Sequence, residues 1–209
     1  MAQYFAIHPT HPQARLIGQA AQIVRAGGVI AYPTDSCYAF GCHLGDKDAL
    51  ERLRRIRGID DKHHLTLVCG DLSAVAQFAR IDNSRFRLLK RLLPGSYTFI
   101  LEATREIPRR ALNAKRKTIG VRVPSHPVTQ ALLRELGEPL LSTTAILPGE
   151  DAALAEAPDI RARLEHQLAL VMDGGTCGTL PTTVVDLTGN EAIIVREGAG
   201  PIDPALFVG

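Results

Sequence analysis

The first half of the chain alternates two hydrophobic patterns, apolar residues at helical spacing and short continuous apolar runs. The first pattern predicts a helix over residues 16–24 that ends before Gly27. Further helices follow residues that can cap them, namely Asp46, Asp71 and Asn83. The second pattern predicts buried strands at residues 29–32, 65–69 and 97–101.

The second half of the chain continues this alternation and ends with a predicted hairpin. Strand patterns cover residues 118–123, 139–143, 168–172, 182–187 and 192–196, and helix patterns cover residues 127–136 and about 159–168. The last two strands flank Thr188-Gly189-Asn190, which suits a tight turn. A hairpin places antiparallel pairing beside crossover units, so the sequence predicts an α/β fold with a mixed, twisted sheet.

Length and composition agree with one globular domain. The chain has 209 residues, of which 45% are hydrophobic and 22% are charged. It contains no apolar stretch of the roughly 18 residues that a membrane span needs. Residues 1–11 lack the basic and apolar segments of a signal peptide. We therefore expect a cytoplasmic protein that does not bind membranes.

The four cysteines are too few and too scattered for a disulfide framework, so we expect them to be reduced. Cys37, Cys42 and His43 lie close together, but their spacing differs from that of zinc ligands. The sequence therefore predicts no metal held by the protein.

Charge is unevenly distributed, although the formal net charge is only +2. Residues 105–122 hold seven positive and one negative side chain, whereas residues 150–173 hold six negative and two positive ones. Such asymmetry predicts one face that attracts a polyanion. The candidate RNA-binding residues on this face are Arg109, Arg110, Lys115, Arg116 and Lys117.

The common catalytic motifs are absent: there is no P-loop, no dinucleotide-binding glycine motif, no nucleophile elbow and no HExxH. Attention therefore falls on strand ends, where α/β sheets bind ligands. Residues 33–41 form a polar loop after a buried strand, whose hydroxyls can hold a small zwitterion. A turn capped by Asp35 explains the same residues equally well.

Cationic and hydroxyl side chains mark the other candidate positions. Four arginines, at positions 52, 54, 55 and 57, end one predicted helix, where they suit either the helix dipole or a bound phosphate. Strand alternation places Thr118, Gly120 and Arg122 on one face. Hydroxyls also follow the apolar strand at residues 139–143, and two adjacent strands can present Thr182 and Arg196 together.

Several of these segments occur in an order and spacing that resemble one family. They are PTDSCYAFG, the basic helix end, LLPGSYTFIL, TIGVRVPSHP, LSTTA, PTTVVDLT and VREG. Together they resemble the YrdC/YciO family, the threonylcarbamoyl-AMP synthase group, and most of all its YciO branch. The resemblance extends from about Ile17 to Gly198.

The resemblance implies a single YrdC-like domain over residues 1–209, with its core at about 14–200, around a large concave, positively charged cavity. Synthases of this group combine L-threonine, bicarbonate and ATP into threonylcarbamoyl-AMP and pyrophosphate, for the t6A modification of tRNA. By position, the threonine-binding residues are Ser36, Arg122, Ser142 and Thr182. The ATP-binding residues are Arg55, Arg57, Thr118, Thr144 and Arg196.

The chemistry of these residue types suits this reaction. Forming the adenylate requires the neutralisation of about four negative charges on ATP, for which arginines and Mg²⁺ are suited. We therefore expect ATP as a substrate accompanied by Mg²⁺, and the catalytic residues remain unknown. His126 is expected to pack in a turn, and Cys37 is a weak candidate nucleophile.

Two positions depart from the family pattern, and two alternatives stay open. Arg55 replaces a lysine, and Ile146 replaces an asparagine whose amide would face the nucleotide. One alternative is a protein that binds tRNA or double-stranded RNA, and nucleotide, with weak or no synthase activity. In the other, the basic stretches are only solvated surface.

Overall fold

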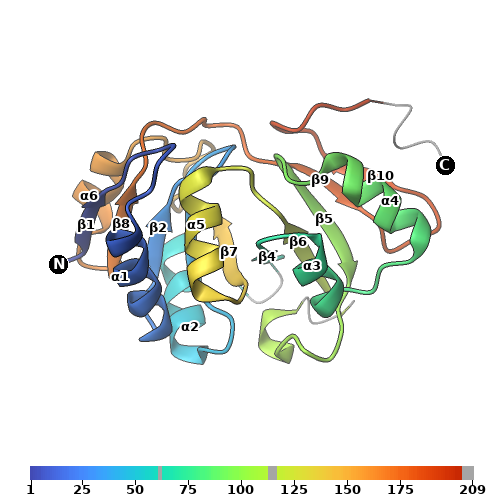
Figure 1. Ribbon diagram of the computed structural model, residues 1–209, viewed down its shortest axis with the longest axis horizontal. Coiled ribbons are helices and arrows are strands. Elements are labelled where there is room, and N and C mark those ends of the chain that lie inside the picture. Colours follow the sequence, from blue (N-terminus) through green and yellow to red (C-terminus); the bar gives the residue numbers. More distant parts are fainter. Residues whose placement is uncertain (61–62, 113–116, 204–209) are drawn as a thin grey trace.

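Ten strands form one mixed β-sheet in the computed structural model, which describes residues 1–60, 63–112 and 117–203 (Figure 1). The strand order is β1-β8-β2-β3-β7-β4-β6-β5-β9-β10. Parallel pairs such as β4 with β6 occur beside antiparallel pairs such as β5 with β6. The predicted α/β fold with a mixed sheet is therefore confirmed.

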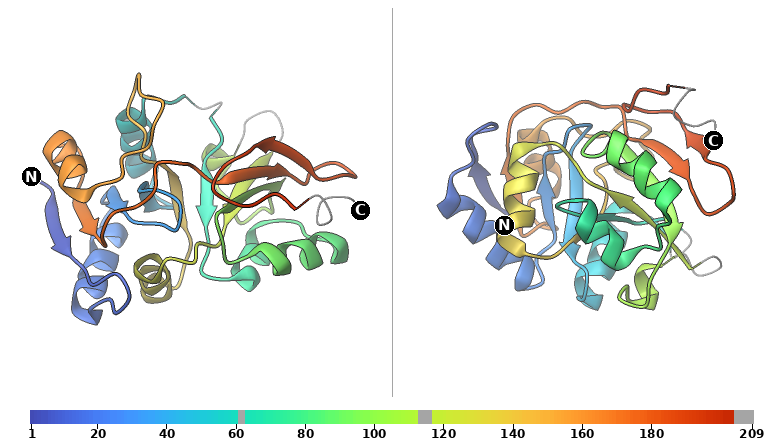
Figure 2. Two further views of the ribbon diagram at one scale, coloured as in Figure 1. Left: turned by 90° about the horizontal axis from the view of Figure 1, so that it is seen from above. Right: turned by 45° about the vertical axis from the view of Figure 1, so that its right-hand side comes forward.

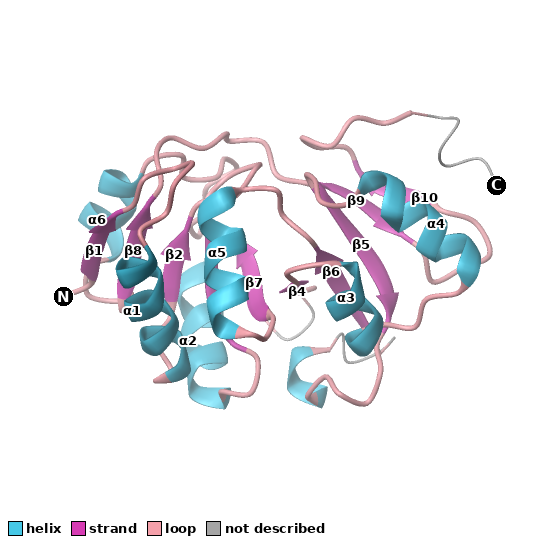
Figure 3. Ribbon diagram, viewed as in Figure 1, coloured by secondary structure: helices cyan, strands magenta, loops and turns pink. Residues whose placement is uncertain are grey.

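The strands are short, and most of them are buried. Their bounds are β1 Gln3–Ala6, β2 Ile30–Tyr32, β3 Ala39–His43, β4 Thr66–Val68, β5 Tyr97–Glu102, β6 Thr118–Arg122, β7 Leu140–Thr144, β8 Leu170–Asp173, β9 Thr183–Asp186 and β10 Ile193–Arg196. The six α-helices of the described residues are α1 Ala14–Arg25, α2 Lys47–Arg57, α3 Leu72–Phe78, α4 Asn83–Leu92, α5 Pro127–Leu136 and α6 Ala157–Leu164. Figure 3 shows them distributed along the whole sheet.

Aspartate side chains begin three of the helices. Asp46 and Asp71 cap α2 and α3 as predicted, because each carboxylate accepts a hydrogen bond from a backbone N–H three residues on. The prediction for α4 was wrong by one residue. Asp82 is its cap and accepts from the Arg85 N–H, while Asn83 is already helical.

Two strands were missing from the prediction. β3 was assigned to a polar loop over residues 33–41, but the chain turns by Tyr38 and returns as a strand antiparallel to β2. Its buried residues pair on both sides, with β2 and β7, and this tertiary pairing overrides the local turn signals. β1 is an edge strand whose half-exposed residues carry no apolar pattern.

The sheet twists strongly, so that one and the same face of the sheet points in different directions at its two ends. α1 and α5 lie in front of the strands at one end, with α2 and α6 behind them (Figures 1 and 2). Adjacent strands rotate by roughly 20–25°, which over ten strands approaches half a turn. The face that carries α1 and α5 at one end has therefore turned to the opposite side at the other end.

As a result of this twist, part of one face of the sheet has no helix packed on it. Gly41, Ser142, Thr66, Gly120 and Ile100 are in register across β3, β7, β4, β6 and β5, so they share this face. Alternate residues of β5 and β6 point the other way and pack in the core with α3 and α4. The uncovered face, over β7 to β10, becomes the floor of a cavity.

No helix in the described part of the chain is long and apolar enough to cross a membrane.

Candidate functional site

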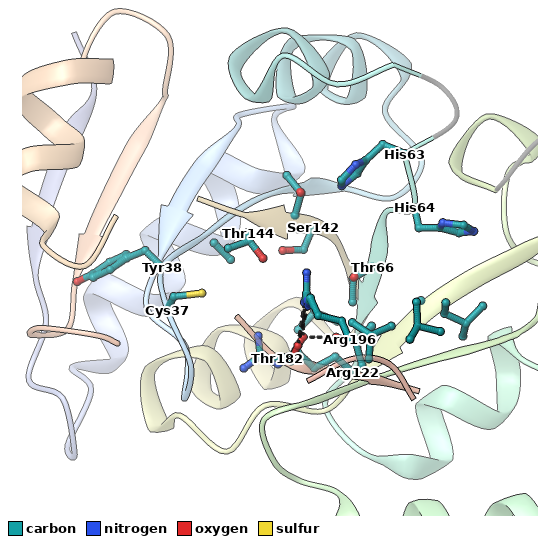
Figure 4. A pocket seen from close by; sticks show the side chains of 18 residues that line it. Cys37, Tyr38, His63, His64, Thr66, Arg122, Ser142, Thr144, Thr182 and Arg196 are labelled. Carbon is teal, nitrogen blue, oxygen red and sulfur yellow. Dashed lines mark hydrogen bonds between the residues drawn. The ribbon is translucent and has the colours of Figure 1, made fainter. Parts of the chain in front are cut away.

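A cavity of about 540 Å³ occupies the uncovered face of the sheet (Figure 4). This volume lies within the range of small-molecule sites. Its walls come from the β2–β3 loop, the segment before β4, and strands β4 to β7, β9 and β10. Segments far apart in the sequence thus meet at one place. The lining side chains that carry hydrogen-bonding groups include Thr66, Thr98, Arg122, Ser142, Thr144, Thr182 and Arg196.

Arg122 is the most buried cation of the cavity, with 7% of its surface exposed. Its Nη2 donates to Asp35 Oδ1 at 2.7 Å and to Thr34 Oγ1 at 3.2 Å. Ser96 Oγ donates to the other carboxylate oxygen of Asp35 at 2.8 Å. The Nε–H of Arg122 is also buried, yet it has no hydrogen-bond partner within the described residues. The guanidinium is therefore fixed on one side and keeps an unsatisfied donor for a ligand.

Ser142 offers an acceptor beside this arginine. Its hydroxyl donates to the Phe40 carbonyl at 2.9 Å, so the Tyr32 hydroxyl, 2.6 Å away, donates to Ser142 Oγ. Burial raises the pKa of Tyr32 to about 12, which keeps this donor protonated. Ser142 Oγ retains one lone pair, which suits an N–H or O–H group of a ligand.

Arg196 lies at the other side of the cavity and is held by backbone. Its Nε and Nη2 donate to the Thr182 carbonyl at 3.2 and 2.8 Å, and Thr182 Oγ1 lies 2.8 Å from Thr98 Oγ1 (Figure 4). Partial burial lowers the pKa of Arg196, but the ordinary pKa of arginine is so high that the guanidinium still carries its charge. Among the described residues its Nη1 forms no hydrogen bond, so this group can donate to a bound anion.

His63 connects the cavity to the end of α2. It lines the cavity, and its pKa is lowered by burial, by Arg57 and by His64, with a smaller effect from Arg196. The imidazole is therefore mainly neutral at pH 7. Arg57 is half-buried, its pKa is also lowered by burial, and its Nε has no hydrogen-bond partner within the described residues. The unpaired Nε–H of Arg57 and one N–H of the neutral imidazole can therefore both donate to an anion at this end of the cavity.

Five of the nine predicted ligand-binding residues line the cavity. They are Arg122, Ser142 and Thr182 from the threonine set, and Thr144 and Arg196 from the ATP set. Thr118 lies on the same face of β6 as Gly120 and Arg122, as predicted, and its buried Oγ1 has no partner among the described residues.

Thr118 and the other three predicted residues do not line the cavity. Ser36 is buried beside it, where its hydroxyl lies 3.2 Å from Thr34 Oγ1 and 3.7 Å from Cys37 Sγ. Arg57 lies near enough to His63, which lines the cavity, to lower the pKa of that imidazole. Arg55 is exposed on α2. The proposed roles of all nine residues stay predictions.

Two threonines and two histidines are among the cavity residues that were not predicted, and only the threonines carried a signal in the sequence. Thr66 and Thr98 interrupt apolar strands with hydroxyls, and strand alternation would have placed them beside Gly120. His63 and His64 precede a strand without any such periodicity. Their position at the cavity depends on the path of the chain after α2, which no local pattern encodes.

Of the two candidate acid, base or nucleophile residues, His126 has a structural role and Cys37 is not activated as a nucleophile. His126 caps α5 by accepting a hydrogen bond from the Val128 N–H at 3.2 Å, in line with the expected turn. Cys37 lines the cavity, but burial raises the pKa of its thiol. A thiol is a poor nucleophile compared with its thiolate. All four cysteines are free.

The predicted RNA-binding residues do not form one row. Arg110 donates to the Gly45 carbonyl near α2, while Arg109 and Lys117 line a separate hollow. Lys115 and Arg116 lie outside the described residues. RNA binding by this set stays a prediction.

No group of three or more His, Cys, Asp or Glu side chains that could hold a metal occurs within residues 1–60, 63–112 and 117–203. Asp35, the carboxylate beside the cavity, is already bound to Arg122 and Ser96. The residues therefore do not fit a Mg²⁺ ion held by the protein alone.

Together, the fold and the cavity define an α/β protein with a small-molecule site built from guanidinium and hydroxyl groups. The Sua5/YciO/YrdC family model, described as "Telomere recombination", matches residues 22–198. The chain belongs to this family.

Similar proteins support this assignment along the full chain. The Escherichia coli K12 protein YciO, described as uncharacterised, is 54% identical over 206 residues, which cover 99% of this chain and all of YciO. The crystal structure of E. coli YciO superposes with a TM-score of 0.95, and the match covers all of both chains. The expected similarity to YciO is thus confirmed.

More distant relatives include named enzymes. The threonylcarbamoyl-AMP synthase of Chromobacterium violaceum is 33% identical over 180 residues, which cover 86% of this chain and 92% of the synthase. The P. abyssi Sua5 structure in complex with L-threonine has a TM-score of 0.86 at 24% identity, and covers 93% of this chain and 57% of its own. This second likeness establishes the shared fold.

Proposed function

We propose that this protein is a threonylcarbamoyl-AMP synthase, which forms threonylcarbamoyl-AMP and pyrophosphate from L-threonine, bicarbonate and ATP. The observation that carries the proposal is the buried, unpaired Nε–H of Arg122 in a cavity that also presents Arg196. The 33% identical relative that bears this enzyme name supports the same reaction.

L-Threonine suits the end of the cavity around Arg122. Its carboxylate would accept from the Arg122 guanidinium, whose planar shape matches two oxygens. Ser142 Oγ would accept from the amino group through its remaining lone pair. Ser36 and Thr182 complete the proposed threonine site, with Thr182 held by Thr98.

ATP suits the remaining space, between the end of α2 and β10. Arg57 and Arg196 would neutralise phosphate oxygens, Thr118 and Thr144 would donate hydroxyl hydrogens, and Arg55 would act from outside the cavity. We expect Mg²⁺ to arrive bound to the triphosphate, because the protein offers no set of metal ligands among its described residues.

The chemical step needs positioning more than a strong base. The amine of threonine and bicarbonate give a carbamate and one water, because the C–N bond forms as a proton of the amine and the hydroxyl group of bicarbonate are lost. A carbamate oxygen then attacks the α-phosphorus of ATP, the bond from this phosphorus to the bridging oxygen breaks, and pyrophosphate leaves with the electron pair. Fixed cations aimed at the charge that develops lower the barrier without reorganising.

Pyrophosphate release tests the proposal. Purified protein is supplied with L-threonine, bicarbonate, Mg²⁺ and ATP, and each component is omitted in turn. We expect release only with all of them present, together with a product of the mass of threonylcarbamoyl-AMP. Release that does not depend on threonine, or no release by a protein that binds both substrates, would overturn the proposal.

The alternative, a protein that binds tRNA or double-stranded RNA without forming an adenylate, is favoured by Ile146, which brings an apolar side chain where the family has an amide. It predicts an affinity for RNA that falls steeply with salt and weakens when Arg109 and Lys117 are neutralised. An affinity for RNA that falls steeply with salt, together with no release of pyrophosphate, would favour this alternative over the synthase.

A further inference from the structure

A second hollow lies at the far end of the β5–β6 ladder and shares no lining residue with the cavity. Its volume is about 850 Å³. It lies where β5 ends and β6 begins. Arg80 also lines it and directly follows Ala79, which forms an isolated β-bridge with Ala103. Its lining residues are Arg80, Ala103, Thr104, Arg105, Ile107, Arg109, Leu112 and Lys117.

All the charged side chains among these lining residues are cations. Arg80, Arg105, Arg109 and Lys117 are exposed, and none of them forms an ion pair with a carboxylate of the described residues. Glu102 and Glu106 are near in sequence but do not line the hollow. Like charges repel one another, so this arrangement favours an anion that binds several of them at once.

The floor of the hollow is apolar. Ile107 is buried with 3% of its surface exposed, Leu112 is half-buried, and Ala103 lies between the strand ends. Four cations and this apolar lining in one hollow match a ligand with both phosphates and an uncharged, flat moiety. The phosphate backbone of duplex RNA offers only charge and sugar to such a surface and leaves the floor unused.

The backbone at Lys117 is unusual as well. Its φ angle is +55°, in the left-handed region that favours glycine, and its carbonyl accepts from the Ala103 N–H at 3.1 Å. A lysine held in this conformation carries strain, and such strain concentrates where a side chain has a task at a ligand site. The hydrogen bond to Ala103 fixes the backbone of Lys117 beside the hollow.

We propose that this hollow is a second nucleotide site, which binds a nucleoside diphosphate or triphosphate through its phosphates and its base. Arg80, Arg105, Arg109 and Lys117 bind the phosphates, and the apolar floor contacts the base. The site stands apart from the cavity, so a nucleotide bound there acts as an effector and not as the substrate. The inference does not depend on the proposed synthase activity.

Equilibrium dialysis with labelled ADP tests the proposal on the full chain. We expect the double variant Arg80→Gln with Arg105→Gln to lose one equivalent of bound ADP and to keep the equivalent in the cavity. The matched control, Arg87→Gln with Arg91→Gln, removes the same charge from α4 and should bind as the unchanged protein does. Equal ADP binding by all three proteins would overturn the proposal.

Two further measurements establish the class of ligand. ADP should bind this hollow at least about tenfold more tightly than pyrophosphate, because only ADP contacts the floor. Equal affinities would overturn a nucleotide site. If short duplex RNA displaces labelled ADP at a lower concentration than unlabelled ADP does, the hollow is assigned to RNA instead. Loss of ADP from an Arg196→Gln variant reports on the cavity alone, so the two proposals fail separately.

Discussion

The two arginines of the cavity are held in opposite ways. Arg122 is 7% exposed and forms a 2.7 Å ion pair with Asp35, whose side chain is 11% exposed, in the middle of the sheet. Arg196 is exposed at the edge strand β10, where a backbone carbonyl and a weak hydroxyl contact of Thr182 hold it. One end of the cavity is thus fixed before a ligand arrives, and the other end is open.

This difference matches what each end is proposed to bind. A fixed guanidinium loses little freedom when it binds a small zwitterion, so it selects by geometry. An open arginine on an edge strand leaves room for a larger ligand and adjusts to it. The exposed Val195, which lines the cavity beside Arg196, adds apolar surface at the open end, which a nucleobase could cover.

The fixed end should be much more sensitive to mutation than the open end. Arg122→Gln leaves the Asp35 carboxylate buried without its cation, so we expect the free energy of unfolding to fall by about 3–5 kcal/mol. Threonine-dependent pyrophosphate release should be lost as well. Urea denaturation and the pyrophosphate assay measure the two effects.

A second variant separates folding from binding at this end. In the double variant Asp35→Asn with Arg122→Gln, neither charge is left unpaired, so its stability loss should be smaller than the sum of the single losses. Threonine-dependent release should nevertheless stay absent. Additive losses would show that the ion pair does not fix the cavity wall.

At the open end, Arg196→Gln should change binding and leave stability nearly intact. A charge-assisted hydrogen bond contributes about 1.5–3 kcal/mol, so the KM for ATP should rise about 10- to 100-fold. The unfolding free energy should change by less than about 0.5 kcal/mol, as for other exposed positions. A large loss of stability would mean that the bonds to the Thr182 carbonyl hold β10 in place.

The sequence predicted the fold where local signals agree with tertiary packing. α5 begins and ends at the predicted residues, because Pro127 suits its first turn and Gly137, at φ +67°, ends it. The prediction missed β3 because its strand conformation depends on pairing with β2 and also with β7, which lies about a hundred residues further along the chain.

The site was predictable in part for a similar reason. The alternation of Thr118, Gly120 and Arg122 within one strand identified their shared face from local spacing. The Asp35–Arg122 ion pair joins residues 87 positions apart, so no local pattern indicates it. Hydroxyls at strand ends marked Ser142 and Thr182, which meet Arg122 only through the sheet order, and the resemblance of motifs assigned both to the threonine site.

The pH dependence of ATP binding should report on the open end through His63. Burial, Arg57 and His64 hold its pKa below 6.5 in the free protein, so unfolding takes up a proton in this range. His63 therefore contributes stability that is present above pH 6.5 and is lost as the pH falls through its lowered pKa.

Bound phosphates would reverse this shift, because an anion stabilises the imidazolium. We expect the affinity for ATP to rise as the pH falls below 6.5, by up to about tenfold per pH unit for one linked proton. Calorimetry at several pH values measures it, and His63→Asn should remove the dependence. His126, whose pKa is also lowered, faces Asp35 and Arg122 and should still titrate in that variant. If the affinity for ATP depends on pH in the same way in His63→Asn as in the unchanged protein, the phosphates lie away from His63.

The smallest expected effects compare the two arginines at the end of α2. Arg57 is half-buried beside His63 with an unpaired Nε, so Arg57→Gln should raise the KM for ATP about fivefold. Arg55 is exposed and does not line the cavity, and exposed ion pairs contribute only about 0.2–1 kcal/mol. Arg55→Gln should therefore raise this KM by about twofold or less. A larger effect at Arg55 than at Arg57 would mean that the triphosphate extends out of the cavity over α2, and that the open end is wider than the free protein indicates.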